Sequence, residues 1–253
     1  MEASAGLGKR VGVLRCYDHL DYAAAWNLQR QLVEERGHDR RPDTLLLMEH
    51  EPVFTVGRSG QRVQGWGDEE VLRKAGYPVH HVERGGSVTY HGPGQLVGYP
   101  ILRLNRFCSG PKTYMRLLEE VIIGTLAAWG LAGRRIEAWP GVWVGGGLEP
   151  PQKIAAMGVR IVQGITMHGF ALNVSVDVAP FARVVPCGIP GCRVTSMTAV
   201  LGKPVQAVAV RQRIAEEFAR VFGLDWIMES PPGEAHPMPV LSGAGQDVKG
   251  DAR

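Results

Sequence analysis

The sequence contains little cysteine and no hydrophobic run long enough to cross a bilayer. Its four cysteines are Cys16, Cys108, Cys187 and Cys192, too few in 253 residues for a small disulfide-stabilised scaffold. The N-terminal residues lack the apolar core of a signal peptide and the repeated arginines of a transit peptide. We therefore expect a cytoplasmic protein, away from membranes, in which each cysteine is a buried side chain, a metal ligand or a nucleophile.

No block of one charge is present either. The chain has 28 Lys and Arg against 25 Asp and Glu, and the resulting formal charge of +3 is spread along the sequence. This pattern predicts no nucleic-acid-binding arm, although an acidic partner protein is compatible with it. The length lies near the top of the single-domain range, so we expect one domain over residues 1–229. Residues 230–253 are rich in Pro and Gly without periodicity and are expected to be disordered.

Strand-like segments come in clusters, and helical segments lie between the clusters. Apolar periodicity predicts helices over residues 21–36, from Pro111 to Trp129, and over residues 205–222, with a short helix around 68–75. This order favours an α+β fold, or an α/β fold with a mixed or antiparallel sheet. The expected strands lie at 11–16, 44–50, 53–57, 78–83, 95–102, 141–144, 153–162 and 165–176, the last two joined by a Gln163-Gly164 turn.

One short segment, ERGGSVTYHGPGQLVGYP (83–100), combines polar side chains with many glycines between two apolar runs. Arg84 could bind a carboxylate, a phosphate or a carbonyl, and His91 and Gln95 add directional polar groups. Glycines at 85 and 86 would let a ligand approach the backbone closely. The alternative is a bulged hairpin in which His91 caps a turn.

A second segment, KIAAMGVRIVQGITMHGFALNV (153–174), opens with a lysine and carries small residues where strands usually carry bulk. A lone lysine at a strand start is usually a solvated edge residue. Small side chains at Ala155, Ala156 and Gly158 would leave room for a ligand. The His168-Gly169 pair echoes His91-Gly92, but a hydrogen-bonded, half-buried histidine is the ordinary explanation for His168.

The third segment, RVVPCGIPGCRVTSM (183–197), places Cys187 between a proline and a glycine in a tight turn. Backbone amides of such a turn could lower the pKa of the thiol or hold an oxyanion, which suits a nucleophile. Alternatively, Cys187 and Cys192 could bind zinc with His91 and His168. Their spacing is acceptable for zinc, but no second cysteine pair supports this alternative.

Taken in order, these segments resemble one family, the octanoyltransferases, which are the lipoyl(octanoyl)-[acyl-carrier-protein]:protein transferases of lipoate biosynthesis. The resemblance runs from about residue 11 to 223. It implies an α+β fold with mixed or antiparallel sheets and flanking helices, similar to lipoate-protein ligases and the catalytic domain of biotin-protein ligases. The matching stretches are EHEPVFTVGR (49–58), RGGSVTYHGPGQ (84–95), KIAAMGVRI (153–161), HGFALNV (168–174) and PCGIPGCRVTS (186–196).

The resemblance also implies a reaction. An octanoyl group would move from octanoyl-acyl-carrier-protein to a specific lysine of a lipoyl domain, in a 2-oxoacid dehydrogenase complex or the glycine cleavage H protein. Cys187 would be the nucleophile that forms a thioester acyl-enzyme, and Lys153 would favour its thiolate and shuttle protons. The donor is already a thioester, so no ATP, metal or other cofactor is expected. The segments matching the acyl pocket of the family are Arg84, Gly85, Gly86, Ser87, Val88, Thr89, Tyr90 and His91, then Ala156, Met157 and Gly158, then Gly169, Phe170 and Ala171.

Two features depart from the family pattern, and three rival functions stay open. The loop at 145–152 is longer than the family usually has, and Cys192 is extra, either buried or part of a regulatory disulfide. The nearest rival is an ATP-dependent lipoate- or biotin-protein ligase on the same fold. Cys187 and the sequence Tyr90-His91-Gly92-Pro93 favour the transferase over it. The others are a non-catalytic acyl- or lipoyl-domain-binding protein and a zinc hydrolase.

Overall fold

Two β-sheets and the helices packed on them form the fold in the computed structural model, which describes residues 10–62, 66–146, 150–185 and 192–230. Within these ranges the main sheet has nine strands in the order β12-β1-β2-β6-β10-β9-β8-β7, with β11 paired to β9, and the small sheet has the order β4-β3-β5. The strands are β1 (Arg10–His19), β2 (Thr44–Glu49), β3 (Val53–Val56), β4 (Val79–His81), β5 (Val88–His91), β6 (Gln95–Ile101), β7 (Arg134–Ile136), β8 (Trp139–Val144), β9 (Gln152–Val162), β10 (Ile165–Asn173), β11 (Arg193–Val194) and β12 (Leu224–Met228).

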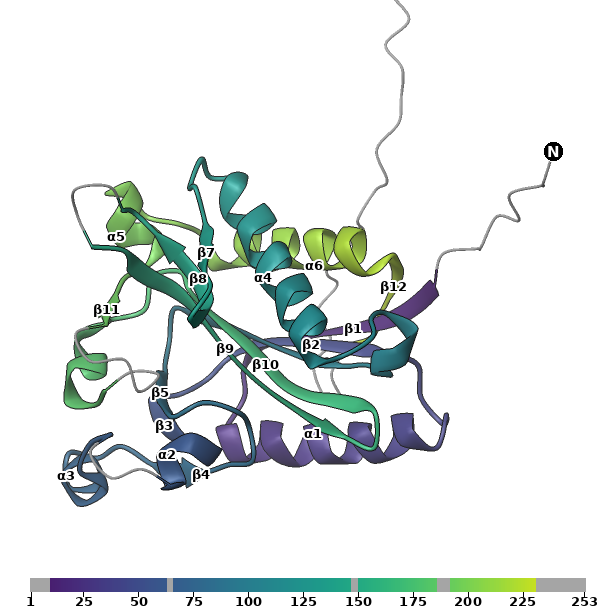
Figure 1. The fold of residues 1–253 in the computed structure, drawn as a ribbon, viewed down its shortest axis with the longest axis horizontal. Helices are drawn as coiled ribbons and strands as arrows, with labels where there is room; N and C mark the ends of the chain where they lie inside the picture. Colours follow the sequence, from purple (N-terminus) through teal and green to yellow (C-terminus); the bar gives the residue numbers. More distant parts are fainter. Residues whose placement is uncertain (1–9, 63–65, 147–149, 186–191, 231–253) are drawn as a thin grey trace, which may run out of the picture.

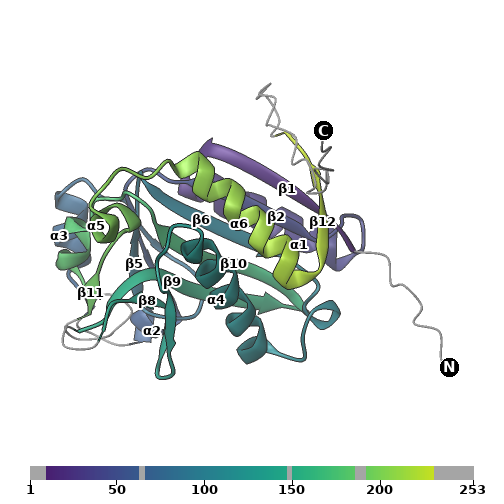
Figure 2. The same ribbon diagram turned by 90° about the horizontal axis from the view of Figure 1, so that it is seen from above.

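Helices cover both faces of the main sheet. Figure 1 shows α1 below the sheet, and α4 and α6 above it; Figure 2, viewed from above, shows α4 and α6 in front of the strands. The α-helices are α1 (Tyr22–Gly37), α2 (Arg58–Arg62), α3 (Glu69–Lys74), α4 (Pro111–Ala127), α5 (Met197–Leu201) and α6 (Ala207–Phe222), with 3-10 turns at Leu104–Arg106 and Ala179–Arg183. In the described part of the chain no helix is both long and apolar enough to span a membrane.

The sequence of β2, TLLLME, shows why this arrangement forms. Successive side chains of a strand point to opposite faces, so a run of apolar residues needs cover on both sides. Leu45 and Leu47 pack in the core beneath α4 and α6. Leu46 and Met48 pack in the core against α1. All four side chains are completely buried, which fixes β2 in the interior of the sheet.

Local signals set the ends of the long helices. Asp21 caps α1 by accepting a hydrogen bond from the Ala24 amide at 2.9 Å. Pro111 occupies the first turn of α4, where its missing N–H is not needed. Gly223 ends α6 in a left-handed conformation with φ +62°, which glycine adopts without strain.

Strand β6 leaves no room for a side chain at Gly169 of β10. A Cβ atom at Gly169 would lie 2.2 Å from the Gly98 carbonyl oxygen and 2.6 Å from Pro100 Cδ. Both neighbours belong to the adjoining strand, so a side chain at residue 169 would force the two strands apart. This contact also gives one reason for glycine in the HGFALNV segment that needs no ligand.

Replacing Gly169 by alanine is therefore expected to destabilise the protein by about 2 kcal/mol, the range found for overpacked cores. Urea denaturation monitored by circular dichroism would measure the loss. Gly37→Ala is the matched control, because a Cβ there meets nothing within 4 Å. Equal midpoints for the two variants would contradict the proposed steric role of Gly169.

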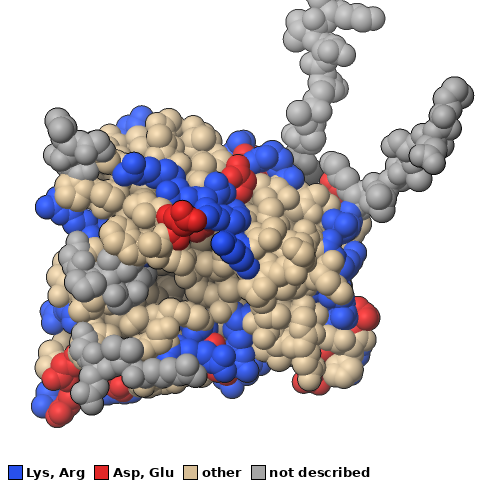
Figure 3. Space-filling model, viewed as in Figure 1, with Lys and Arg blue, Asp and Glu red and all other residues tan. Residues whose placement is uncertain are grey.

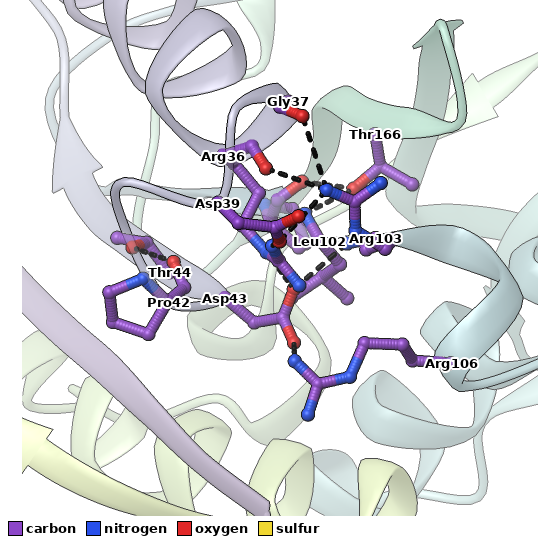
Figure 4. A network of polar contacts seen from close by, with 11 residues as sticks. Arg36, Gly37, Asp39, Pro42, Asp43, Thr44, Leu102, Arg103, Arg106 and Thr166 are labelled. Carbon is purple, nitrogen blue, oxygen red and sulfur yellow. Dashed lines mark hydrogen bonds and ion pairs between the residues drawn. The ribbon is translucent and has the colours of Figure 1, made fainter.

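A buried carboxylate fastens the end of α1 to the sheet (Figure 4). Asp43 is fully buried and accepts hydrogen bonds from Arg36 Nε and the Arg103 amide, each at 2.8 Å. Its second oxygen accepts from Arg106 Nη1 at 2.8 Å. Arg103 Nη2 donates to the carbonyls of Arg36 and Gly37 at the helix end, at 3.1 and 3.2 Å. One carboxylate thus joins three separate chain segments.

Most of the elements expected from the sequence are present. The α+β class, the three long helices and the Gln163-Gly164 hairpin turn are confirmed. The predicted strand at 165–176 ends earlier, at Asn173, because the Gly94 carbonyl accepts the amides of residues 174–176. Strands β5, β7, β11 and β12 were not predicted. The expectation for the C-terminal tail concerns residues outside the described ranges, except for residue 230.

Candidate functional site

A cavity of about 160 Å³ lies where the small sheet meets strands β6, β9 and β10 of the main sheet. Its walls come from segments far apart in the sequence. The loop before β5 and β5 itself form one wall, and β9 and β10 form another. The start of α1 and the start of β8, with the residue before it, complete the cavity. Most of the exposed lining is apolar, with a few polar groups, as is typical of a site for a small organic ligand.

Lys153 brings an amino group to this cavity although its residue is only 2% exposed. Its Nζ donates to the Pro140 carbonyl at 3.1 Å and lies 4.7 Å from the centre of the Trp143 ring. Glu119 of α4 accepts from the Gly141 amide at 3.1 Å and so holds the turn that supplies this carbonyl. No salt bridge joins Lys153 to a carboxylate among the described residues, so its charge is met by a carbonyl and an aromatic face.

Arg84 lines the cavity and also holds its glycine-rich loop in place. Its Nη2 donates to the Thr55 carbonyl at 2.7 Å and to Thr55 Oγ1 at 2.9 Å, and its Nη1 donates to the Gly85 carbonyl at 3.0 Å. The Gly85 amide in turn donates to the Val159 carbonyl of β9 at 2.9 Å. A Cβ at Gly158 would lie 2.9 Å from the Gly85 oxygen. Part of the room left by these glycines is thus filled by backbone.

Histidine and tyrosine rings form one side of the cavity and the layer behind it. Tyr22 of α1 stacks on His91 with ring centres 5.8 Å apart, and His50 lies edge-on to both rings. His50 is fixed by contacts of its two nitrogens with the Leu20 carbonyl at 2.6 Å and Tyr99 Oη at 2.8 Å. Burial lowers the pKa of His50 to about 4 and the pKa of His91 to about 3, so both rings are neutral near pH 7.

These neutral histidines predict a loss of stability in acid. An unfolded histidine gains a proton near pH 6.5, whereas His50 in the folded protein gains one only near pH 4. Between these values the unfolded state binds more protons, so the free energy of unfolding falls as pH falls. Urea midpoints measured between pH 7 and 5 should show this decrease, and His50→Gln should make it shallower. The exposed His38→Gln control should retain the wild-type slope.

The structure brings most of the predicted site residues to one cavity. Tyr90 and Gly85 do not line it: the Tyr90 ring packs in the core of the small sheet with Phe54 and Phe181, and Gly85 contributes the backbone contacts described above. Cys187 lies outside the described residues. The predicted residues that do line the cavity are Arg84, Gly86, Ser87, Val88, Thr89, His91, Lys153, Ala156, Met157, Gly158, Gly169, Phe170 and Ala171.

Several lining residues were not predicted. Tyr22 is the first residue of α1, and this position brings it to the cavity. Trp139 is 39% exposed and its ring lies 5.5 Å from that of Trp143. His168 was expected to be an ordinary half-buried histidine or, alternatively, a zinc ligand. Its φ of +57° is rare for a residue with a side chain, and Gln29 Oε1 accepts a hydrogen bond from its amide at 2.9 Å. The others are Val97, Tyr99, Ala138 and Pro140.

Charged side chains of both signs are mixed on one face of the molecule (Figure 3). On the face drawn in Figure 3, Lys and Arg form several separate clusters with Asp and Glu among them. Within the described ranges, no three His, Cys, Asp or Glu side chains come together as a metal-ligand group. The zinc alternative also involved Cys187, which is not among the residues described.

Comparison with known proteins gives the class of this domain. The family described as Lipoyl protein ligase A/B catalytic domain matches residues 21–219. The fold agrees with a bipartite lipoate protein ligase from Thermoplasma acidophilum, with a TM-score of 0.65, 18% identity and 88% of each chain covered. A lipoate-protein ligase A bound with ATP gives a TM-score of 0.65 at 17% identity, over 87% of this chain and 89% of that one.

The sequence relatives narrow the class. The octanoyltransferase of Rubrobacter xylanophilus is 48% identical over 204 residues, which cover 80% of this chain and 89% of the relative. The octanoyltransferase of Acidobacterium capsulatum is 45% identical over 228 residues, covering 86% and 93%. The chain therefore belongs to the octanoyltransferases, a family of acyltransferases. The resemblance inferred from the ordered motifs is confirmed.

Proposed function

We propose that the chain transfers an octanoyl group from octanoyl-acyl-carrier-protein to a lysine of a lipoyl domain, through a thioester on Cys187. Lipoyl domains of 2-oxoacid dehydrogenases and the glycine cleavage H protein are the proposed acceptors. The observation that carries the proposal is the position of Lys153, a buried amino group at a mostly apolar cavity. A cation in this setting stabilises a nearby thiolate and can exchange protons with a substrate.

The chain around Lys153 supports pairing with Cys187. Strand β11 runs parallel to the start of β9, with Val194 opposite Lys153 and Arg193 opposite Gln152. The Thr195 amide donates to the Lys153 carbonyl at 3.0 Å. The residues that follow the Cys187 segment therefore lie beside Lys153. This position supports the proposal that the Cys187 thiol and the Lys153 amine act together in the reaction.

In the first half reaction, the Cys187 thiolate attacks the donor thioester. The carbon–sulfur bond to the carrier protein breaks, and Lys153 supplies the proton that converts the leaving thiolate to a thiol. In the second half reaction, neutral Lys153 takes one proton from the acceptor ammonium. The amine attacks the acyl-enzyme carbonyl, the Cys187 thiolate leaves, and the nitrogen releases its second proton to water. One proton is released for each amide formed, and the starting charge state is restored.

The cavity wall suits an extended acyl chain. Ala156 and Ala171 stand opposite each other on β9 and β10, as do Met157 and Phe170. Small side chains next to larger apolar ones leave a narrow space that buries methylene groups, each worth about 0.8 kcal/mol. The neutral histidine and tyrosine layer behind this wall adds no charge to it. An apolar acyl chain therefore fits this part of the cavity.

Intact-protein mass spectrometry after mixing the chain with octanoyl-acyl-carrier-protein, without ATP, tests the proposal directly. We expect a mass increase of one octanoyl group that hydroxylamine removes, and none in Cys187→Ser. A lipoyl domain added next should gain the octanoyl group. An unmodified but folded and reduced wild-type protein would overturn the thioester route, and ATP-dependent acylation would then point to ligase chemistry.

A further inference from the structure

Two buried amide side chains, Gln95 and Asn173, connect His91 by hydrogen bonds to the backbone at Thr195. Its Nδ1 lies 2.7 Å from Gln95 Oε1. Gln95 Nε2 donates to Asn173 Oδ1 at 2.9 Å and to the Tyr90 carbonyl at 3.2 Å. Asn173 Nδ2 donates to the Thr195 carbonyl at 2.9 Å. Gln95 and Asn173 are 1% and 4% exposed, so water does not compete at these contacts.

The backbone carbonyls of Thr195 and Tyr90 fix the direction of each hydrogen bond between His91, Gln95 and Asn173. A carbonyl oxygen only accepts, so the Asn173 atom facing Thr195 must be its amino nitrogen. The Asn173 oxygen then faces Gln95 and must receive the amino group of Gln95, which also reaches the Tyr90 carbonyl. The remaining oxygen of Gln95 faces His91. Because this oxygen only accepts, the proton of the neutral imidazole must be on Nδ1.

The second ring nitrogen, Nε2, therefore carries a lone pair and no proton. Among the described residues no hydrogen bond to Nε2 is formed, and the ring lines the same cavity as Lys153. In this tautomer His91 cannot donate to an acyl carbonyl or an oxyanion. It can only accept a hydrogen bond, so it suits an N–H group of an incoming molecule.

We infer that Nε2 of His91 accepts a hydrogen bond from the attacking amine of the acceptor lysine, and that Gln95 and Asn173 are positioning residues that hold this tautomer. The inference rests on the proposed acyl transfer. The hydrogen bond would orient the amine lone pair toward the thioester carbon while Lys153 takes the proton. The hydrogen bonds from His91 through Gln95 and Asn173 end at the Thr195 carbonyl, and the Thr195 amide donates to the Lys153 carbonyl. The backbone at Thr195 therefore helps to position both His91 and Lys153.

The surroundings keep the ring neutral, as this role requires. The charged and titratable groups that act on His91 are His50, Arg84 and His168, and Tyr22 stacks on its face. No carboxylate is among them. Burial is the largest cause of the lowered pKa of His91, and the neighbouring cation Arg84 lowers this pKa further.

The tautomer can be measured without any substrate. In the full chain labelled with ¹⁵N-histidine, two-bond ¹H–¹⁵N correlations distinguish Nδ1–H from Nε2–H, and His91→Asn identifies the His91 signals. We expect Nδ1–H in the wild type and a mixture of tautomers in Gln95→Met, which keeps the volume but removes the acceptor. Gln61→Met is the matched control, because Gln61 Nε2 also donates two hydrogen bonds, to the Val56 and Val82 carbonyls, and neither partner is a histidine.

Single-turnover kinetics test the role in catalysis. Acyl-enzyme formation from octanoyl-acyl-carrier-protein and acyl transfer to a lipoyl domain are timed separately by mass spectrometry. His91→Asn keeps the donor to Gln95 but loses Nε2, so transfer to lysine should slow by roughly tenfold, the loss expected for one hydrogen bond. Thioester formation should change by less than about threefold, and Gln95→Met should show the same selectivity to a smaller extent.

The tautomer and kinetic measurements can each contradict the proposed role of His91. An Nε2–H tautomer in the wild type, or equal slowing of both half reactions in His91→Asn, would overturn the inference. If His91→Asn did not fold, the wild-type tautomer and the Gln95→Met kinetics would still decide it. Absence of a thioester in the wild type would instead count against the proposed function, and the tautomer assignment would stand.

Discussion

Replacing Lys153 by methionine is expected to slow acyl-enzyme formation by about a thousandfold, within the range for loss of an acid–base group. The methionine fills similar volume but removes both the cation that stabilises the thiolate and the proton that the leaving thiol needs. Rapid-quench mass spectrometry with octanoyl-acyl-carrier-protein would measure the rate. An unchanged rate would show that Lys153 has no part in the chemistry.

Two further variants make this result specific. Lys153→Arg keeps a positive charge but does not give up its proton near neutral pH. Lys153→Arg should therefore slow transfer to the acceptor lysine. Its thermal stability should stay close to that of Lys153→Met. Lys203→Met, at an exposed position between α5 and α6, is the control and should keep the wild-type rate.

Replacing Asp43 by asparagine is expected to lower the free energy of unfolding by about 3 kcal/mol, as found when one partner of a buried ion pair is removed. Asparagine retains an acceptor for the Arg103 amide but leaves the guanidinium of Arg36 without its buried counter-charge. Arg36 is itself 3% exposed, so water cannot replace the carboxylate. Urea denaturation at neutral pH and constant ionic strength would measure the loss.

Asp39→Asn is the matched control, because Asp39 also contacts Arg36 and Arg103 but its side chain is 72% exposed. Solvent screens such a pair, and the substitution should leave the urea midpoint close to that of the wild type. Similar midpoints for the two variants would show that burial of Asp43 does not determine its contribution.

The sequence predicted best what depends on neighbouring residues. The helix containing residues 22–37 follows from the stripe of Tyr22, Ala25 and Leu32, and the turn at Gln163-Gly164 follows from its residue types. Strand β12 was missed because five residues after a helix carry little periodic signal, and its pairing with β1 depends on residues more than 200 positions away. Pairing partners of strands are set by packing across the whole chain.

The candidate site shows the same division. Motif order placed most of the cavity residues and the family, because each motif is a short local pattern. The role of Gln95 could not be predicted from sequence, since its partners Asn173 and Tyr90 come together only when β5, β6 and β10 are assembled. Likewise, the resemblance assigned Gly169 to the acyl pocket, and only the structure shows that a side chain there would meet the Gly98 carbonyl.

The parallel pairing of β1 with β12, the first and last strands described, has a consequence for synthesis on the ribosome. Arg10 is opposite Leu224 and Leu14 is opposite Met228, and Glu229 then binds Arg15 and Arg41. A nascent chain cannot complete this edge of the sheet until residue 229 has left the exit tunnel. Until α6 emerges, Leu14 and Leu45 lack part of their cover, so the growing chain exposes apolar surface to which a chaperone can bind.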